Sequence, residues 1–334
     1  MAKTKNNIDK ENMREVIINS PNQLVKGLDL AKDIKTEGSF KNVIICGMGG
    51  SPLPADILNS IVLPSAPIYI HRDYNLPAFA TKDSLIICIS YSGNTEETIS
   101  SLQQAVEKGF KIIAIATGGK MEEICKQNNI SLAKIPAGIQ PRSATGYLFS
   151  ALSTILANCG IISDISGDIL KTTDELAKIN SSLEKSGKGL AKKLAKKIPV
   201  VYASDSFKEV AKIWKIKFNE NSKIPAFHNF FPELNHNEMV GFSNVKKTNN
   251  LHVLIIKDKD DHERIIKRMN LTSSILKKKG VKIDFIETKD GSLMFRVFSS
   301  LLLGDWTSYY LAINQKIDPT PVAIVEEFKG LMKK

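Results

Sequence analysis

The sequence lacks any run that approaches the roughly eighteen consecutive apolar residues of a membrane-spanning helix, so we expect no such helix. Residues 1–7 are largely polar and lack the apolar core of a secretory signal peptide. Hydrophobic residues make up 43% of the 334 residues and charged residues 24%, which is typical of a globular protein long enough for two domains. The sequence therefore predicts a cytoplasmic protein with no membrane partner.

Cysteine and histidine are scarce, which argues against a disulfide framework and against a metal centre. The four cysteines form no CxxC pair and are far apart, at Cys46, Cys88, Cys125 and Cys159. The five histidines show no pair of the HxxxH kind, at His71, His228, His236, His252 and His262. We therefore expect reduced cysteines that serve mostly in packing, no metal site and no cofactor.

Acidic residues are outnumbered, 35 to 46, by lysine and arginine, which leaves a formal net charge of +11. Such a balance can indicate nucleic-acid binding, but no recognised nucleic-acid motif is present and lysine greatly outnumbers arginine. Much of the excess lies in predicted helical stretches such as 188–197 and 277–279. We favour a positive field that attracts a small anionic substrate, and we expect no nucleic-acid partner.

The most informative stretch is the string Ser-Tyr-Ser-Gly-Asn-Thr that begins at Ser90. The uncharged apolar segment 84–89 before it predicts a buried parallel strand, and the apolar spacing over 95–109 predicts a helix. The unpaired N–H groups of a helix start, together with the hydroxyls of Ser90, Ser92 and Thr95, suit a dianionic phosphate. The alternative is an ordinary helix cap, which uses the same residue types.

A second glycine-rich turn, Gly-Met-Gly-Gly-Ser-Pro at 47–52, follows the predicted strand 42–46. It could belong to a dinucleotide fingerprint, GxGxxG, with Asp73 as the ribose-binding acid. Because a proline replaces the third glycine, we favour a turn that lines the same pocket as the Ser90 loop through Gly49, Gly50 and Ser51.

Strands and helices alternate along both halves of the chain, which predicts doubly wound parallel sheets in three αβα layers. The first half has further predicted strands at 68–70, 111–116 and 131–135 and an apolar helix at 145–158. After a polar, lysine-rich helical connection, the pattern restarts, with strands at 198–204, 251–257 and 281–287, helices at 207–219 and 262–279, and a long apolar helix at 293–314.

This repeated pattern predicts two domains, residues 1–160 and 161–334, with a last helix that reaches Lys329. The turn Ser-Asp-Ser at 204–206 of the second copy has fewer hydrogen-bond donors than the Ser90 loop. We therefore expect the second copy to bind no phosphate of its own.

Two unusual strings in the second half supply candidates for acid–base chemistry. Asn-Glu-Asn at 219–221 places Glu220 at the end of a predicted helix, where the negative end of the dipole disfavours a charged carboxylate, as suits a general base. Leu-Asn-His-Asn-Glu at 234–238 carries His236. From the residues alone, Glu220 could equally be a solvated acid, and His236 could be a capping or core histidine.

Together these strings resemble a known family. Ser-Tyr-Ser-Gly-Asn-Thr resembles the phosphate loop of sugar-isomerase (SIS) domains, and the whole chain is similar to the bifunctional phosphoglucose/phosphomannose isomerase family. The matching pieces, in the family's order, are the turn at 47–52, the loop at 90–95, Pro141-Arg142, Asn-Glu-Asn, Leu-Asn-His-Asn-Glu, and Asp-Pro-Thr-Pro at 318–321 with Lys329 behind it. The resemblance implies two tandem SIS domains of flavodoxin-like fold with a C-terminal helix.

The resemblance also implies a reaction, which interconverts glucose 6-phosphate and mannose 6-phosphate with fructose 6-phosphate, without metal, through a cis-enediolate. It implies a homodimer with a shared active site. By the resemblance, Glu220 moves the proton between C1 and C2, and His236, from the neighbouring subunit, helps to open the ring. Arg142 steadies the enediolate charge, Lys329 assists ring opening, and Thr320 is the candidate for mannose acceptance.

Two other classes of function stay open at this stage. A non-catalytic regulatory SIS protein would bind the same phosphosugar, although Glu220, His236 and Arg142 together would then serve no purpose. An enzyme of amide transfer or deamination on glucosamine 6-phosphate would be expected to carry an amidotransferase domain with a leading cysteine, and the sequence shows none.

Overall fold

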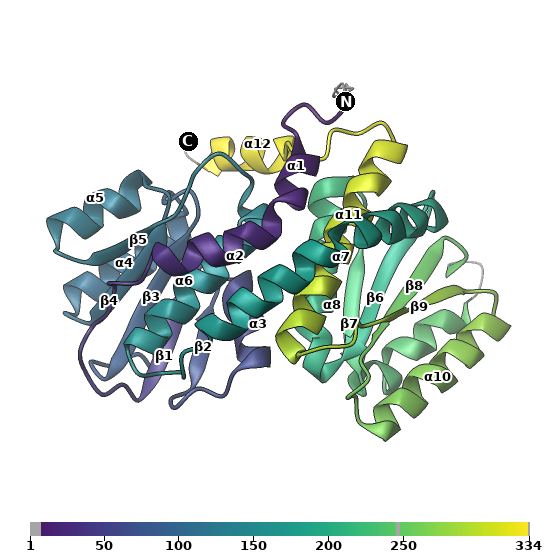
Figure 1. Ribbon diagram of the computed structural model, residues 1–334, viewed down its shortest axis with the longest axis horizontal. Coiled ribbons are helices and arrows are strands. Elements are labelled where there is room, and N and C mark those ends of the chain that lie inside the picture. Colours follow the sequence, from purple (N-terminus) through teal and green to yellow (C-terminus); the bar gives the residue numbers. More distant parts are fainter. Residues whose placement is uncertain (1–7, 245–247, 333–334) are drawn as a thin grey trace. The chain divides into compact units, whose positions relative to one another are not determined.

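A computed structural model of the protein describes residues 8–244 and 248–332 (Figure 1). The chain forms two compact units. The first-sheet unit comprises Asn19–Lys178, and the second-sheet unit combines the described residues up to Ile18 with the chain from Ile179 onward. The division falls inside α7 (Ser166–Lys193), so that one continuous helix belongs to both units.

A parallel sheet in the order β2-β1-β3-β4-β5 forms the centre of the first-sheet unit. Its strands are β1 (Asn42–Cys46), β2 (Ile68–His71), β3 (Ser84–Ser90), β4 (Lys111–Ala116) and β5 (Ser131–Lys134). Every residue of β3 is buried, as its uncharged sequence predicts. Strand order reverses between β1 and β3, and open α/β sheets bind ligands at the carboxyl ends of the strands beside such a switch point.

Helices cover both faces of this sheet (Figure 1). They are α2 (Ser20–Asp29), α3 (Leu53–Ile61), α4 (Glu96–Glu107), α5 (Gly119–Gln127) and α6 (Thr145–Asn158), with the short 3-10 helix η1 (Pro141–Ser143). Leu102 of α4 and Met121 of α5 share one buried cluster with Ile44 and Ile86 of the sheet. On the other face, α2 and α3 pack against α6. Alternate side chains of each strand supply the two faces.

The second-sheet unit is built on a parallel sheet in the order β7-β6-β8-β9. Its strands are β6 (Ile198–Ser204), β7 (Phe227–Phe231), β8 (Leu251–Lys257) and β9 (Lys282–Glu287). The helices α8 (Lys208–Ser222) and α11 (Leu293–Asn314) pack against each other. On the opposite face, α10 (Glu263–Lys278) places Met269 and Leu276 in one buried cluster with Val253 and Ile255.

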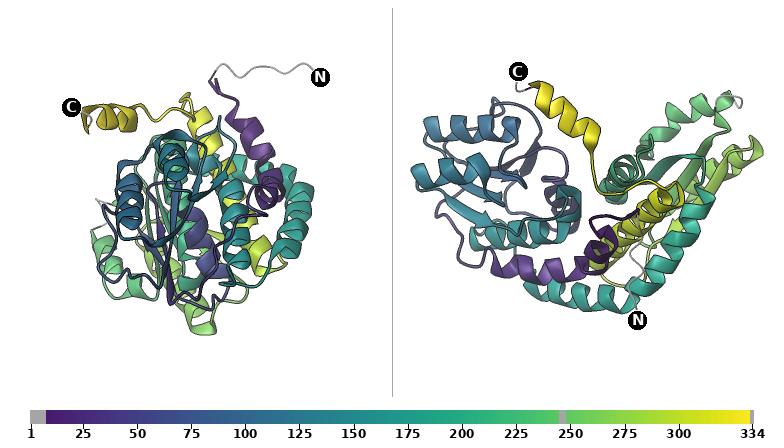
Figure 2. Two further views of the ribbon diagram at one scale, coloured as in Figure 1. Left: turned by 90° about the vertical axis from the view of Figure 1, so that its left-hand side faces the viewer. Right: turned by 90° about the horizontal axis from the view of Figure 1, so that it is seen from above.

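Shorter elements complete this unit: α1 (Met13–Ile18), the 3-10 helices η2 (Asp205–Phe207), η3 (Glu233–Asn235) and η4 (Glu238–Ser243), and α12 (Ala323–Met332). The last of these extends away from the end of α11 (Figure 2). In the part of the chain that the structure describes, none of the helices combines the length and the apolar character that a membrane crossing requires.

The predicted fold class, with parallel sheets flanked by helices in both halves, is confirmed. The predicted helices at 145–158 and 293–314 coincide with α6 and α11, because both are apolar over most of their surface. One strand was missed. His228 and Asn229 interrupt the apolar pattern of β7, and an edge strand tolerates such polar residues.

The compact units do not coincide with the predicted division at residue 160. The hydroxyl of Tyr309 on α11 donates a hydrogen bond of 3.1 Å to Asp9, so the start of the described chain packs with the second-sheet unit. The limits of the two domains stay a prediction.

Candidate functional site

The Ser90 loop joins β3 to α4 at the switch point of the first sheet. The buried Oγ of Ser90 lies 2.8 Å from Oγ1 of Thr95 and accepts a hydrogen bond of 3.1 Å from the backbone N–H of Gly93. Thr95 is the N-cap residue of α4, but its side chain accepts no hydrogen bond from the helix. The ordinary-cap interpretation therefore fails for Thr95, whose hydroxyl instead closes the loop onto Ser90.

The turn between β4 and α5 braces this loop. Gly93 has φ of 69°, and a Cβ placed on it would lie 1.7 Å from the carbonyl oxygen of Gly118, so this position requires glycine. The N–H of Met121 donates to the Gly93 carbonyl at 2.9 Å. Ser92 is exposed on the loop, and its Oγ accepts from the N–H of Asn94 at 3.2 Å. Our sequence reasoning missed this brace, although the glycine pair that follows strand 111–116 was a visible signal.

The glycine turn after β1 lies against the same loop. Gly49 has φ of 58°, and a Cβ on Gly50 would lie 2.9 Å from the backbone nitrogen of Arg142. The buried Oγ of Ser51 accepts a hydrogen bond of 3.0 Å from the N–H of Tyr91. The structure thus brings the glycine turn, the Ser90 loop and the segment of Arg142 together.

Arg142 lies in η1 and is 1% exposed. Its Nη1 donates to Oε1 of Gln140 at 3.4 Å, and the side-chain amide of Gln23 anchors the same segment by donating to the carbonyl of Ser143 at 2.9 Å. Hydroxyls, a glycine turn and a guanidinium in neighbouring segments form an arrangement that suits a phosphorylated anion.

Glu220 lies half-buried in the last turn of α8, as predicted. The side chain of Asn219 donates to the carbonyl of Ile224 at 2.9 Å, just beyond the helix. The buried side chain of Asn221 donates to Oγ of Ser308 on α11 at 3.0 Å. The two asparagines of the Asn-Glu-Asn string therefore fix the turn that carries Glu220.

A buried ion pair supports the same end of α8. Lys217, one turn before Glu220, lies 2.5 Å from the carboxylate of Asp305 on α11, and its side chain is 4% exposed. A buried charge is tolerated when it is paired in this way. Sequence reasoning did not single out this lysine, because its partner lies 88 residues away in the chain.

His236 follows η3 and is exposed, and no described residue forms a hydrogen bond to its ring. The segment around it is well anchored. The Glu238 carboxylate accepts hydrogen bonds from Tyr202, at 2.5 Å, and from Asn229. Burial and this carboxylate raise the pKa of Tyr202, so its hydroxyl stays a donor. The side chain of Asn235 donates to Thr272 at 2.9 Å. A fixed backbone thus presents an exposed imidazole.

Glu220 and His236 lie beyond opposite ends of strand β7. The chain enters β7 only a few residues after the end of α8, so Glu220 is near the amino end of β7. His236 comes after the carboxyl end of β7. A strand of five residues spans about 16 Å. Within one second-sheet unit, Glu220 and His236 are therefore separated by about the length of this strand.

The two remaining candidates lie in the C-terminal segment. Thr320 is buried, and its N–H donates to Oδ1 of Asp318 at 3.1 Å. Lys329 lies on α12 and is exposed, and its Nζ pairs with Glu326 at 2.8 Å. Among its described residues α12 has no buried position. The structure therefore does not bring Lys329 to Glu220 within the second-sheet unit.

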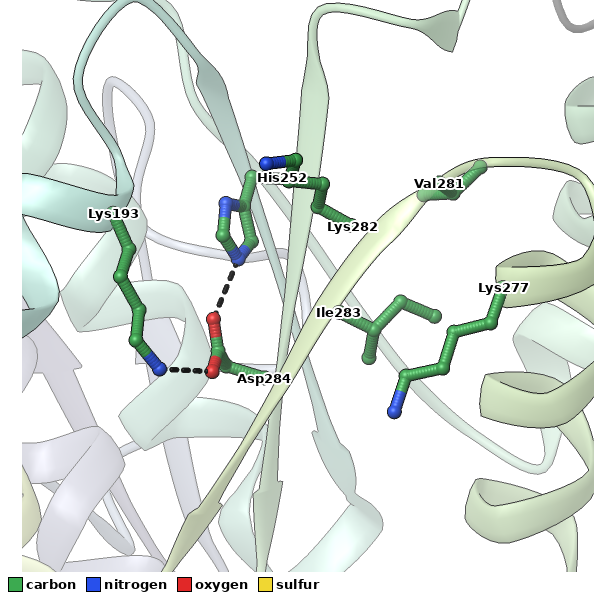
Figure 3. A pocket seen from close by; sticks show the side chains of 7 residues that line it. All are labelled: Lys193, His252, Lys277, Val281, Lys282, Ile283 and Asp284. Carbon is green, nitrogen blue, oxygen red and sulfur yellow. Dashed lines mark hydrogen bonds and ion pairs between the residues drawn. The ribbon is translucent and has the colours of Figure 1, made fainter.

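A pocket of about 400 Å³, at the amino ends of β8 and β9, is lined by none of these residues (Figure 3). In it, Asp284 bonds Lys193 at 2.5 Å and the ring of His252 at 2.8 Å. Burial works to raise the pKa of Asp284, but these two hydrogen bonds outweigh it and hold that pKa below its usual value. Across the described residues, no cluster of histidine, cysteine and carboxylate side chains could hold a metal ion.

Comparisons with known proteins agree with both halves of the chain. Residues 72–158 match the SIS domain family, and residues 183–332 match the bacterial phospho-glucose isomerase C-terminal SIS domain family. A "bifunctional phosphoglucose/phosphomannose isomerase" of Caldicellulosiruptor bescii is 37% identical, over 95% of this chain and 98% of its own length. One of Aquifex aeolicus with the same name is 35% identical, over 92% and 94%.

A relative with another name is also similar. A "D-glucosamine-6-phosphate 4-epimerase" of Sulfolobus acidocaldarius is 31% identical, over 70% of this chain and 74% of its own length. Among solved structures, a putative phosphosugar isomerase from Clostridium difficile matches with a TM-score of 0.69 and 14% identity, over 92% of this chain and 95% of its own. At that identity the match supports the fold alone.

Proposed function

The chain belongs to the bifunctional phosphoglucose/phosphomannose isomerase family, and from that premise we propose that it interconverts glucose 6-phosphate and mannose 6-phosphate with fructose 6-phosphate. The observation that carries the proposal is the 37% identity over 98% of a relative with this name. The grouping of Arg142 with the Ser90 loop and the glycine turn supports it. A cytoplasmic location is part of the proposal.

The first-sheet unit holds the phosphate in this proposal. Ser90, Ser92 and Thr95 lie at the start of α4, whose N–H groups and dipole favour an anion. The glycine turn at Gly49, Gly50 and Ser51 lies beside them and leaves room for the substrate because it carries so few side-chain atoms. Binding by these groups sets the position of the sugar carbons that react.

Glu220 is the base. It takes the proton from C2 of the open-chain aldose, the C–H electron pair forms the C1–C2 double bond, and the pair of the C1 carbonyl moves to O1, which gives a cis-enediolate. A proton then passes from the O2 hydroxyl to O1. Glu220 returns its proton to C1 while the carbonyl forms at C2, which gives the ketose. Arg142 stabilises the negative charge that develops on the oxygens, as preorganised cations do. Because Arg142 supplies the positive charge, we expect prolonged treatment with a chelator to leave the activity intact. If chelation abolished the activity and added zinc restored it, this step would be refuted.

Ring opening precedes proton transfer and needs a proton donor and acceptor at the ring oxygen and the C1 hydroxyl. We assign this step to His236, with help from Lys329, and mannose acceptance to Thr320. The separation of Glu220 from His236 along β7 supports a homodimer in which each sugar meets Glu220 of one chain and His236 of the partner subunit.

A coupled assay tests the function. Purified protein is given fructose 6-phosphate, and the appearance of glucose 6-phosphate and mannose 6-phosphate is followed separately. We expect both products. A protein that binds the sugar phosphate without turnover would be a regulatory SIS protein. Turnover of glucosamine 6-phosphate alone, to its C4 epimer, would assign it the activity named for the Sulfolobus relative.

A further inference from the structure

The end of α8 has a feature that the proposed mechanism leaves unused. The last carbonyl groups of a helix have no partner within it, and a residue in the left-handed conformation commonly ends the helix. At α8 this residue is Lys223, with φ of 54°. Glycine is the usual choice there because it has no Cβ that is strained in this conformation, and asparagine follows because its short polar side chain can form local hydrogen bonds. Lys196 and Lys316 also have positive φ, so the side-chain contacts of Lys223, and not its backbone, distinguish it.

The side chain of Lys223 bridges two backbone carbonyl groups. Its Nζ donates a hydrogen bond of 2.5 Å to the backbone carbonyl of Glu220 and a second, of 3.1 Å, to the carbonyl of Pro319. Pro319 directly precedes Thr320, which is buried. One ammonium group therefore ties the turn of Glu220 to the segment of Thr320.

The other contacts of this turn run elsewhere. Asn221 bonds Ser308 on α11, and Asn219 bonds the carbonyl of Ile224. They hold the turn against α11 and against the chain that leads into β7. Lys223 adds the connection to the segment between α11 and α12 that carries Thr320.

We propose that Lys223 is a positioning residue that fixes Glu220 relative to Thr320 and so couples proton transfer to the choice between glucose and mannose 6-phosphate. The inference rests on the proposed function. Glucose and mannose 6-phosphate differ in the configuration at C2, the carbon from which the base takes the proton. A small shift of Glu220 against its surroundings therefore changes the two reactions unequally, and misplacement by about 1 Å can cost about a hundredfold in rate.

The chain offers a matched control. Lys316 follows the end of α11, has φ of 59° and is exposed, and its side chain forms no hydrogen bond or ion pair with a described residue. Glycine at either position keeps the left-handed backbone and removes the ammonium group. Methionine keeps the aliphatic stem and the original backbone strain. The pairs K223G with K316G, and K223M with K316M, therefore isolate the contribution of the Lys223 ammonium group.

For both Lys223 variants we expect kcat to fall about tenfold with KM changed less than about twofold, and the ratio of kcat/KM for glucose and mannose 6-phosphate to shift at least about threefold. Lys223→Arg, which keeps donors at the end of a long side chain, should recover most of the rate and the wild-type ratio. Lys316 variants should match the wild type. If one Lys223 variant fails to fold, the other decides.

Wild-type kcat and ratio in a folded Lys223 variant would overturn the inference, and so would a fall in kcat that leaves the ratio unchanged, because a merely structural role predicts that result. These outcomes differ from failure of the proposed function, in which the wild-type protein itself would isomerise neither sugar.

Discussion

At the switch point of the first sheet, between β1 and β3, the chain presents glycines and hydroxyls, whereas between β6 and β8 of the second sheet it presents carboxylates. Asp258, directly after β8, is 3% exposed and accepts hydrogen bonds from Thr288 at 2.7 Å and from Nε of Arg296 at 2.8 Å. Arg296 also pairs with Asp260 at 2.7 Å. Burial raises the pKa of the neighbouring Asp261.

The same sheet topology thus carries side chains of opposite character in the two units. In the first sheet the switch point presents donors to an anion, and in the second it is closed by an internal ion pair whose carboxylates repel one. The chemical group that we assign to the second sheet, Glu220, lies instead at the far end of α8. A switch point therefore becomes a ligand site through the charge of its side chains, and topology alone does not decide it.

The largest effect should come from the two ends of α8. Glu220→Gln keeps the shape of the side chain and removes the base, so we expect kcat to fall about ten-thousandfold, the upper end for general base catalysis. The matched control is Glu209→Gln at the start of α8, beside the second switch point, where Glu209 pairs with Lys212 at 3.0 Å. The control should retain the wild-type kcat, and an equal loss in both variants would remove the distinction between the two ends.

Mixing variants tests where His236 acts. Glu220→Gln and His236→Ala homodimers should each lack an intact site. After subunit exchange, a mixed dimer has one site with both defects and one with neither. Because random exchange makes about half of the dimers mixed, up to half of a site per dimer, averaged over all dimers, should be recovered. Exchange that mass spectrometry confirms, with no recovered activity, would place Glu220 and His236 in the site of one subunit.

The next effect concerns the closed switch point. Asp258→Asn removes the buried charge partner of Arg296 and leaves only the exposed Asp260. We therefore expect a loss of unfolding free energy below the about 3–5 kcal/mol that a fully uncompensated buried charge costs. Urea unfolding should show this loss, while KM for the folded protein stays unchanged. Asp260→Asn is the control, since its carboxylate is 58% exposed and such pairs contribute at most about 1 kcal/mol. A raised KM in the Asp258 variant would mean that this point also binds substrate.

A smaller effect compares serines in the two corresponding turns. Ser92→Ala removes a hydroxyl from the phosphate loop, and a hydrogen bond to a charged group is worth about 1.5–3 kcal/mol, so KM for fructose 6-phosphate should rise about tenfold or more. Turnover should change less. Ser206→Ala, in the exposed turn after β6, should leave KM at the wild-type value. An unchanged KM in the Ser92 variant would refute the phosphate site.

The smallest effect concerns acid stability. Asp284, in the second sheet, has a lowered pKa, so its contribution to stability is present above its unfolded pKa of about 3.9 and is lost as the pH falls through the folded pKa. Asp284→Asn should therefore unfold with a shallower pH dependence below about pH 4. Circular dichroism over an acid titration measures this slope. Equal slopes in the wild type and the Asp284 variant would contradict the assignment.

Much of the fold could be predicted because apolar runs mark buried elements directly. The segment 84–89 became β3, and 293–314 became α11. By contrast, β7 lies at an edge and its pattern is broken by His228 and Asn229. Its apolar residues, which include the exposed Phe227, do not alternate as those of a half-buried strand would.

The strings around the candidate site could also be found, since each is a local sequence feature. The positions of these strings relative to one another could not be predicted. Glu220 and His236 are 16 positions apart in the sequence, and only the topology of β7 shows that they lie beyond opposite ends of this strand. The same holds for Lys223, because its contact with Pro319 joins residues 96 positions apart.

The close packing of Gly93 against Gly118, which braces the Ser90 loop, has a consequence for the thermodynamics of binding. A loop held by the turn after β4, by its own hydroxyls and by the backbone of Met121 has lost its conformational entropy when the chain folds. Binding of a phosphate therefore does not require the loop to become ordered. Its association should therefore proceed in one step, without a slow isomerisation after the encounter, and its affinity should fall little on warming beyond what hydration of the anion dictates.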